Sequence, residues 1–178
     1  MFEIIVAILV ILALAVAAVL ILALRKPDTF RVQRGATIDA PPEKIFPLIG
    51  DFRQWRAWSP WEERDPELQR TYSGAASGPG AVYQWRGNRN VGAGRMEILD
   101  APPPHLIVIK LDFISPFEGH NTAEFTLSPQ GGSTNVTWLM HGPAPLSSKV
   151  MQVFMNMDDM IGKDFAAGLA NLKRVTEG

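Results

Sequence analysis

Residues 147–177 carry one broad apolar face at helical spacing. Intervals of three and four residues separate its positions, which places the side chains on one side of an α-helix. The apolar positions are Val150, Val153, Phe154, Met157, Met160, Ile161, Phe165, Leu169 and Leu172. We expect one helix of at least about six turns, with an N-cap at Ser147. Such a helix needs a matching apolar surface to cover its stripe.

The middle of the chain offers that surface as short segments of alternating polarity. In residues 105–115, Ile107, Ile109, Leu111 and Phe113 alternate with more polar neighbours, as in a half-buried strand. Glycine- and proline-rich breaks separate the segments and indicate turns. The expected strands are residues 30–38, 68–73, 81–86, 91–100, 105–115, 121–128 and 135–141. Short helical pieces are expected over residues 39–50 and 51–58, between the first two strands.

This pattern predicts an α+β fold. Short loops between successive strands favour an antiparallel meander, curved around the long C-terminal helix. The glycines of the segment Gly92-Ala93-Gly94 precede more strand rather than a helix, so they do not form a dinucleotide-binding loop. They are more typical of a bend or bulge in a strongly curved sheet.

The N-terminus contains an apolar run of a different kind. Residues 4–24 consist only of Ile, Val, Ala and Leu. About 21 residues form a helix of roughly 31 Å, which matches the hydrocarbon thickness of a bilayer. The alternative is a cleaved signal peptide. Glu3 before the run, the length of the run and the lack of a small-residue cleavage site favour an uncleaved anchor.

We therefore predict a single-pass membrane protein with an anchor over residues 1–26 and one folded domain over residues 27–178. Arg25, Lys26, Arg31 and Arg34 follow the span, and no basic side chain precedes it. The positive-inside tendency then places the C-terminal domain on the cytoplasmic side.

Composition excludes several classes of function. The formal net charge is -1, and no run of Lys or Arg exceeds two residues, so nucleic acid is not an expected partner. The chain has no cysteine, which excludes disulfides, thiolate nucleophiles and zinc–thiolate sites. The three histidines, His105, His120 and His141, show no metal-ligand spacing. We expect no metal and no cofactor.

Several segments together resemble the polyketide cyclase/dehydrase-like branch of the SRPBCC superfamily, which includes START-type lipid-transfer domains and birch-pollen-allergen-like proteins. They occur in family order over about residues 30–177. The segments are DAPPEKIF at 39–46, DFRQWRAWSPW at 51–61, Trp85 with Gly87, GAGRM at 92–96, TNVTW at 134–138, and Asp164-Phe165 with Gly168, Leu169, Leu172 and Lys173. The resemblance implies a helix-grip fold with a hydrophobic cavity between the sheet and the C-terminal helix.

Seven aromatic or methionine side chains on predicted inward faces are candidates for lining that cavity. Such side chains suit an irregular apolar ligand, but they equally suit an ordinary core. The candidates are Tyr83, Trp85, Phe113, Trp138, Met140, Phe154 and Met157. The leading hypothesis is a membrane-anchored domain that binds a hydrophobic small molecule or lipid without transforming it.

Two alternatives remain open. An enzyme of the polyketide cyclase or dehydratase type would need at least two ionisable groups in the cavity near Trp138, with Arg86 and Glu124 as candidates. A protein-interaction module would instead have a closed core and an exposed apolar patch, expected around Trp58 and Trp61.

Overall fold

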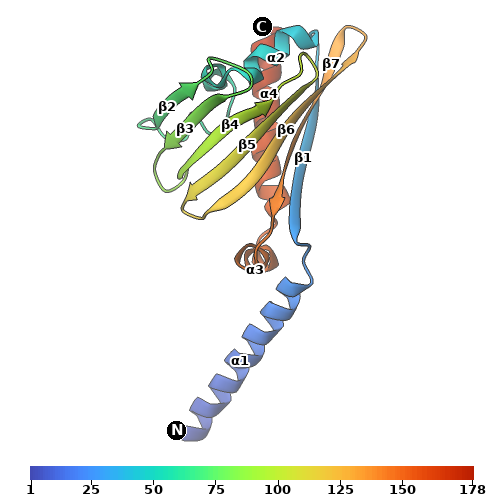
Figure 1. Ribbon diagram of the computed structural model, residues 1–178. Helices are drawn as coiled ribbons and strands as arrows, with labels where there is room; N and C mark the ends of the chain where they lie inside the picture. Colours follow the sequence, from blue (N-terminus) through green and yellow to red (C-terminus); the bar gives the residue numbers. More distant parts are fainter.

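The computed structural model describes residues 1–178 as a curved antiparallel sheet with helices on one side and a projecting N-terminal helix (Figure 1). The seven strands lie in the order β1-β7-β6-β5-β4-β3-β2. Strands β2 to β7 are therefore sequential neighbours, and β1 pairs with β7 at one edge. Their bounds are β1 Thr29–Ile38, β2 Gln69–Gly74, β3 Ala81–Arg86, β4 Ala93–Asp100, β5 Leu106–Ser115, β6 Gly119–Gln130 and β7 Ser133–Pro143.

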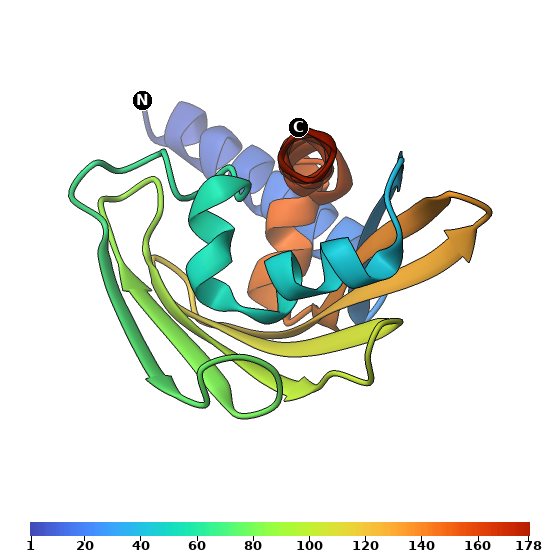
Figure 2. The same cartoon turned by 90° about the horizontal axis from the view of Figure 1, so that it is seen from above.

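Three helical segments lie on the concave side of the sheet (Figure 2). They are α2 (Pro42–Gly50), the 3-10 helix η1 (Phe52–Ala57) and the C-terminal helix α4 (Met157–Glu177). Arg34 of β1 donates three hydrogen bonds of 3.0 Å to Asp158, two to its carboxylate and one to its backbone carbonyl. These bonds join the start of α4 to the edge strand of the sheet. The predicted α+β helix-grip fold is confirmed.

The prediction of one unbroken C-terminal helix is wrong. Residues 146–154 form a separate helix, α3 (Leu146–Phe154), and the chain is extended at Met155 before α4 begins. The side chain of Asn156 accepts hydrogen bonds from the backbone N–H groups of Asp158 and Asp159 and so caps α4. Ser147 is not an N-cap, because α3 already begins at Leu146 after Pro145. The apolar spacing continues across the break, so periodicity alone did not reveal it.

The core lies between the concave face of the sheet and α4. Ile107 and Ile109 of β5 are fully buried, as the alternation predicted, and meet Leu169 and Leu172 in one continuous core. On the other face of β5, Lys110 is exposed. Phe165, Leu169 and Leu172 of α4 are buried in this core, whereas Met160, near the start of the helix, is exposed.

Gly94 marks a bulge in β4, as expected for a glycine inside a curved strand. The register between β4 and β5 shifts at Ala93 and Gly94. The indole of Trp85, directly opposite on β3, covers the glycine: a Cβ atom there would lie 2.3 Å from the ring. It would also lie 2.6 Å from the backbone carbonyl oxygen of Asp112. Only glycine fits this position without displacing a ring and a strand.

Gly94→Ala is expected to lower the free energy of unfolding by about 3 kcal/mol, because overpacking forces Trp85 and β5 to move. Urea unfolding of the full chain in detergent, followed by tryptophan fluorescence, measures the change. Gly132→Ala is the matched control, since a Cβ atom there meets nothing within 4 Å. Equal stability of the two variants would show that the close approach at Gly94 does not constrain the sheet.

The N-terminal helix α1 (Phe2–Leu24) projects away from the sheet (Figure 1). It is long and apolar enough to cross a membrane. Almost all of its side chains are exposed, apart from half-buried Val19 and fully buried Ala23 near its end. The helix α3 packs alongside α1.

Candidate functional site

The structure divides the seven candidate ligand-binding residues into three groups. Tyr83, Trp138 and Met140 are buried, whereas Trp85, Phe113 and Met157 are half-buried. Phe154 is 71 % exposed, so the prediction that it faces inward is wrong. Its helix, α3, is separated from α4 by the break at Met155 and does not lie on the sheet.

Trp138 lies in a closely packed aromatic cluster. Its ring stacks on Phe165 of α4 with ring centroids 4.1 Å apart and an interplanar angle of 6°. Trp55, Trp58 and Trp61 meet it edge-on at 5.6–6.2 Å. These side chains fill the space between the sheet and α4 at this point, as the core interpretation of Trp138 expects.

A second group of aromatic side chains forms a row across β2, β3 and β5, which we call the aromatic row: Tyr72, Tyr83, Trp85 and Phe113. Successive ring centroids are 5.2, 5.9 and 6.0 Å apart. The row begins with a stacked pair of tyrosines and ends with Phe113 meeting Trp85 edge-on. Three of its four members are only half-buried, so this part of the concave face presents apolar surface that other side chains do not cover completely.

A polar cluster borders the aromatic row. Glu62, in the loop between η1 and β2, is only 8 % exposed. Its carboxylate accepts a hydrogen bond of 2.7 Å from the hydroxyl of Tyr83 and one of 2.5 Å from Nε of Arg70. Arg70 also donates to the backbone carbonyl of Glu62 at 3.0 Å. The polar groups of Glu62, Arg70 and Tyr83 therefore provide hydrogen-bond partners for one another, as buried polar groups require.

Sequence reasoning missed this cluster. Glu62 lies in a loop without periodicity, where nothing indicates burial. Arg70 carried a usable signal, because it is two residues from Tyr72 on the same strand and therefore shares its face.

Burial is the main cause of the raised tyrosine pKa values in this region. It raises the pKa of Tyr83 far above the ordinary value for tyrosine, and the hydrogen bond to Glu62 adds to the effect. Burial also raises the pKa of Tyr72. Both hydroxyls stay protonated at neutral pH, and that of Tyr83 donates to Glu62.

Two buried polar atoms have no hydrogen-bond partner: the hydroxyl oxygen of Tyr72 and Nε1 of Trp138. An unsatisfied buried donor typically destabilises a protein by about 1–3 kcal/mol. A bound molecule that offers an acceptor beside Tyr72 would remove that penalty. The free hydroxyl is at the end of the aromatic row, next to the polar cluster.

The residues expected for the two alternative functions lie elsewhere. Arg86 is exposed, and Glu124 contacts His141 at 3.1 Å on the face of β6 opposite buried Phe125. Neither points into the core, so the expectation that these two candidates face a cavity near Trp138 is wrong. Trp58 is 1 % exposed, and Trp61 packs against the core, so neither forms the expected apolar patch.

The histidines do not gather into a metal site. No group of three or more His, Cys, Asp or Glu residues has metal-binding geometry. His120 contacts Asp112 at 2.8 Å on the side of β5 that faces away from the core. This contact favours the imidazolium ion and raises the pKa of His120 above the ordinary value for histidine.

Asp112→Asn is expected to lower the pKa of His120, measured by NMR titration of its ring protons. With the native pair, the raised pKa means that the contact stabilises the fold below the pKa of unfolded histidine. This stabilisation disappears as pH rises through the folded-state pKa. Glu67→Gln, in the loop before β2, is the control and should leave the titration unchanged. An unaltered His120 titration in Asp112→Asn would contradict the assignment.

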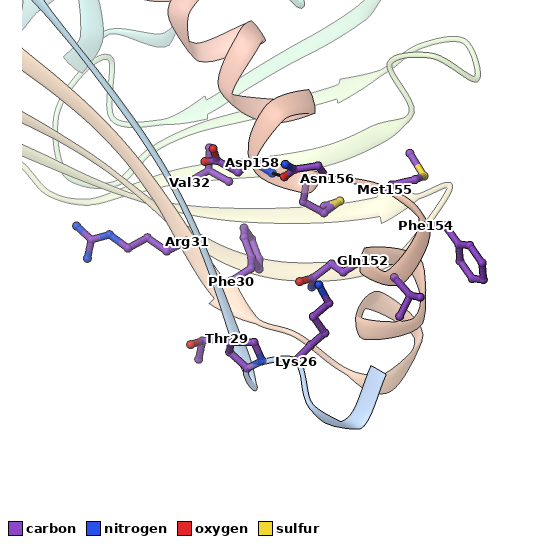
Figure 3. A pocket seen from close by; sticks show the side chains of 13 residues that line it. Lys26, Thr29, Phe30, Arg31, Val32, Gln152, Phe154, Met155, Asn156 and Asp158 are labelled. Atoms are coloured by element: carbon purple, nitrogen blue, oxygen red, sulfur yellow. Dashed lines mark hydrogen bonds between the residues drawn. The ribbon is translucent and has the colours of Figure 1, made fainter. Parts of the chain in front are cut away.

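Two hollows lie where α1 joins the rest of the chain. The first, about 490 Å³, lies between the start of β1 and the segment that links α3 to α4 (Figure 3). Phe30, Gln152 and Met157 help to line it, and Figure 3 shows the ring of Phe154 directed away from β1. The second, about 430 Å³, is lined by Leu22, Arg25, Lys26 and Val153. Neither lies between the sheet and the length of α4.

A family model described as polyketide cyclase / dehydrase and lipid transport matches residues 29–177. No curated protein matches the chain.

Solved structures match with low sequence identity. Major latex-like protein 151 from Panax ginseng has a TM-score of 0.60 and 11% identity, covering 84% of this chain and 99% of its own. A protein from Mycobacterium smegmatis has a TM-score of 0.58 and 22% identity, with coverages of 84% and 92%. The di-domain ARO/CYC protein BexL, from the BE-7585A biosynthetic pathway, has a TM-score of 0.61 and 16% identity, with coverages of 88% and 53%. At these identities the likeness shows the fold alone.

Proposed function

Because this chain belongs to the polyketide cyclase / dehydrase and lipid transport family, whose helix-grip members typically bind hydrophobic ligands, we propose that it is a membrane-anchored protein that binds a hydrophobic small molecule or lipid. In this proposal α1 is the anchor, within residues 1–26, and residues 27–178 form the binding domain. The ligand is bound and released without chemical change.

The aromatic row carries the proposal. Tyr72, Tyr83, Trp85 and Phe113 offer adjoining ring surfaces, three of them half-buried, on the concave face of the sheet. Ring surfaces bind apolar groups without demanding one geometry, and the free hydroxyl of Tyr72 can donate to one acceptor atom. An apolar molecule with a polar end, such as a fatty acid or an isoprenoid acid, has this chemistry.

The predicted anchor also supports binding of a hydrophobic ligand. The apolar residues of α1 are exposed along almost the whole helix, as expected for a segment solvated by lipid. A domain held at the bilayer by a short connection meets membrane-derived ligands at a high effective concentration. Arg25, Lys26, Arg31 and Arg34, which follow the span, favour a cytoplasmic domain.

Photocrosslinking tests where the ligand binds. The full chain in lipid nanodiscs is incubated with a fatty acid that carries a diazirine group, illuminated and digested, and the modified peptides are identified by mass spectrometry. We expect modified peptides from β2, β3 and the end of β5. The double variant Trp85→Ala/Phe113→Ala should reduce this labelling several-fold, whereas Leu99→Ala, an exposed residue of β4, should not. Labelling confined to α1 would contradict binding by the domain.

The polar cluster favours one second candidate, an enzyme of the cyclase or dehydratase type. Glu62 and Arg70 are two ionisable groups that border the aromatic row, in place of the predicted Arg86 and Glu124. A carboxylate hydrogen-bonded to a tyrosine hydroxyl can shift a proton within a bound substrate. A product found with the wild-type chain and absent with Glu62→Gln, under conditions where both bind the ligand, would favour this candidate.

A further inference from the structure

We propose that α3 and the turn between β5 and β6 form a second membrane contact, a docking surface that rests on the lipid bilayer beside the anchor. This proposal rests on the proposed anchoring of α1 but does not depend on the identity of any ligand. We call this surface the bilayer-facing surface and define it by Ile114, Phe117, Leu146, Phe154 and Met155.

The depth of α3 follows from its contact with α1. Val19 and Ala23, one helical turn apart, are the two α1 residues that are not exposed, and α3 packs alongside this helix. Ala23 precedes the end of the apolar span at Leu24 by one residue. A helix that packs on the last turn of a membrane span lies at the level of the bilayer interface.

The connection between α1 and the sheet leaves little freedom to lift α3 away. Residues 25–28 alone separate α1 from β1. Within them, the carboxylate of Asp28 accepts a hydrogen bond of 2.5 Å from Nζ of Lys149, a buried residue of α3. The ammonium group of Lys149 is therefore turned toward the connection. The apolar residues Leu146 and Phe154 of α3 remain exposed.

The exposed apolar side chains gather at this end of the molecule. Strands β1, β4 and β6 begin at the same end of the sheet at which β5 and β7 finish. The β5–β6 turn therefore lies at the end of the sheet from which α1 projects (Figure 1). In that turn Phe117 is 69 % exposed, and Ile114 just before it is 64 % exposed. After α1 in the chain, the exposed large apolar residues are Leu99, Ile114, Phe117, Leu146, Phe154, Met155, Met160 and Val175. All but Leu99 and Val175 lie at this end.

Charge at this end also suits a lipid surface. Arg25 and Lys26 follow the span, and Arg89 lies in the loop between β3 and β4 at the same end of the sheet. None of these three cations forms an ion pair. The acidic residue of the turn, Glu118, contacts His120 at 3.4 Å. Free cations beside exposed apolar side chains are the combination that binds headgroups and the outer acyl region together.

The absence of cysteine allows a direct test with single spin labels in the full chain. Nitroxide labels are placed at Ser147→Cys in α3 and at Glu118→Cys in the β5–β6 turn, which keeps every apolar residue of the bilayer-facing surface. Leu12→Cys reports the middle of α1, and Gly132→Cys reports the opposite end of the sheet. The protein is reconstituted in nanodiscs of phosphatidylcholine and phosphatidylglycerol. Collision rates with oxygen, which concentrates in lipid, and with a water-soluble nickel chelate then give the depth of each label.

We expect Leu12→Cys to be deep, Ser147→Cys and Glu118→Cys to lie at the interface, and Gly132→Cys to be in water. Adding Phe117→Ser and Phe154→Ser should move both interfacial labels toward the aqueous values while Leu12→Cys stays deep. Both phenylalanines are exposed, so these changes leave the core intact. A deep Leu12→Cys with aqueous Ser147→Cys and Glu118→Cys would overturn the docking surface alone. An aqueous Leu12→Cys would overturn the anchor as well.

Discussion

Trp138→Ala is expected to lower the free energy of unfolding by about 4 kcal/mol, the largest loss among the changes considered for this chain. Trp138 is 3 % exposed and stacks face to face on Phe165, so its removal separates the centre of β7 from α4. Trp55, Trp58 and Trp61 meet it edge-on and cannot collapse into the space without losing their own contacts. Urea unfolding followed by near-ultraviolet circular dichroism measures the change.

Two further variants separate the role of the ring from that of the strand. Trp138→Phe keeps a ring on Phe165 and removes the unpartnered N–H, so it should be less damaging than alanine. Leu139→Ala changes the next residue of β7, which is half-buried and points to the other side of the sheet. A loss for Trp138→Ala no larger than that for Leu139→Ala would contradict the assignment of the aromatic cluster as the centre of the core.

Glu62→Ala is expected to lower the free energy of unfolding by about 3 kcal/mol, because it leaves a largely buried guanidinium without its carboxylate. The Tyr83 hydroxyl loses its acceptor in the same change. Glu63→Ala provides a matched control, since Glu63 is exposed and adjacent in sequence, and its effect should stay within about 0.5 kcal/mol.

The double variant Glu62→Ala/Arg70→Met isolates the pair. Removing both charges should restore part of the stability lost in Glu62→Ala, since no uncompensated buried charge remains. Strictly additive losses would show that Glu62 and Arg70 act independently and that the 2.5 Å contact carries no coupling.

The fold could be predicted from the sequence because its signals are periodic. Alternation in residues 105–115 placed Ile107 and Ile109 in the core, and short loops specified sequential antiparallel pairing. The glycine at position 94 was correctly associated with a bulge. Each of these features depends on near neighbours in the chain.

The features that sequence reasoning missed depend on single side chains or on distant contacts. The break before α4 rests on the amide oxygen of Asn156, which offers the backbone a new helix start within an unbroken apolar pattern. The burial of Glu62 depends on Arg70 and Tyr83, which approach it only after β2 and β3 pair. Phe154 faces outward because the break lets α3 pack against α1 instead of continuing along the sheet.

Mass spectrometry of the full chain, extracted from its own host into native nanodiscs, tests ligand binding most directly. The protein is measured intact and again after denaturation and organic extraction, with Trp85→Ala/Phe113→Ala prepared in parallel. We predict an apolar molecule that co-purifies with the wild-type chain in constant proportion and is depleted several-fold from the double variant. A wild-type chain that carries only the lipids of its nanodisc, in the same proportions as the double variant, would contradict ligand binding by the aromatic row.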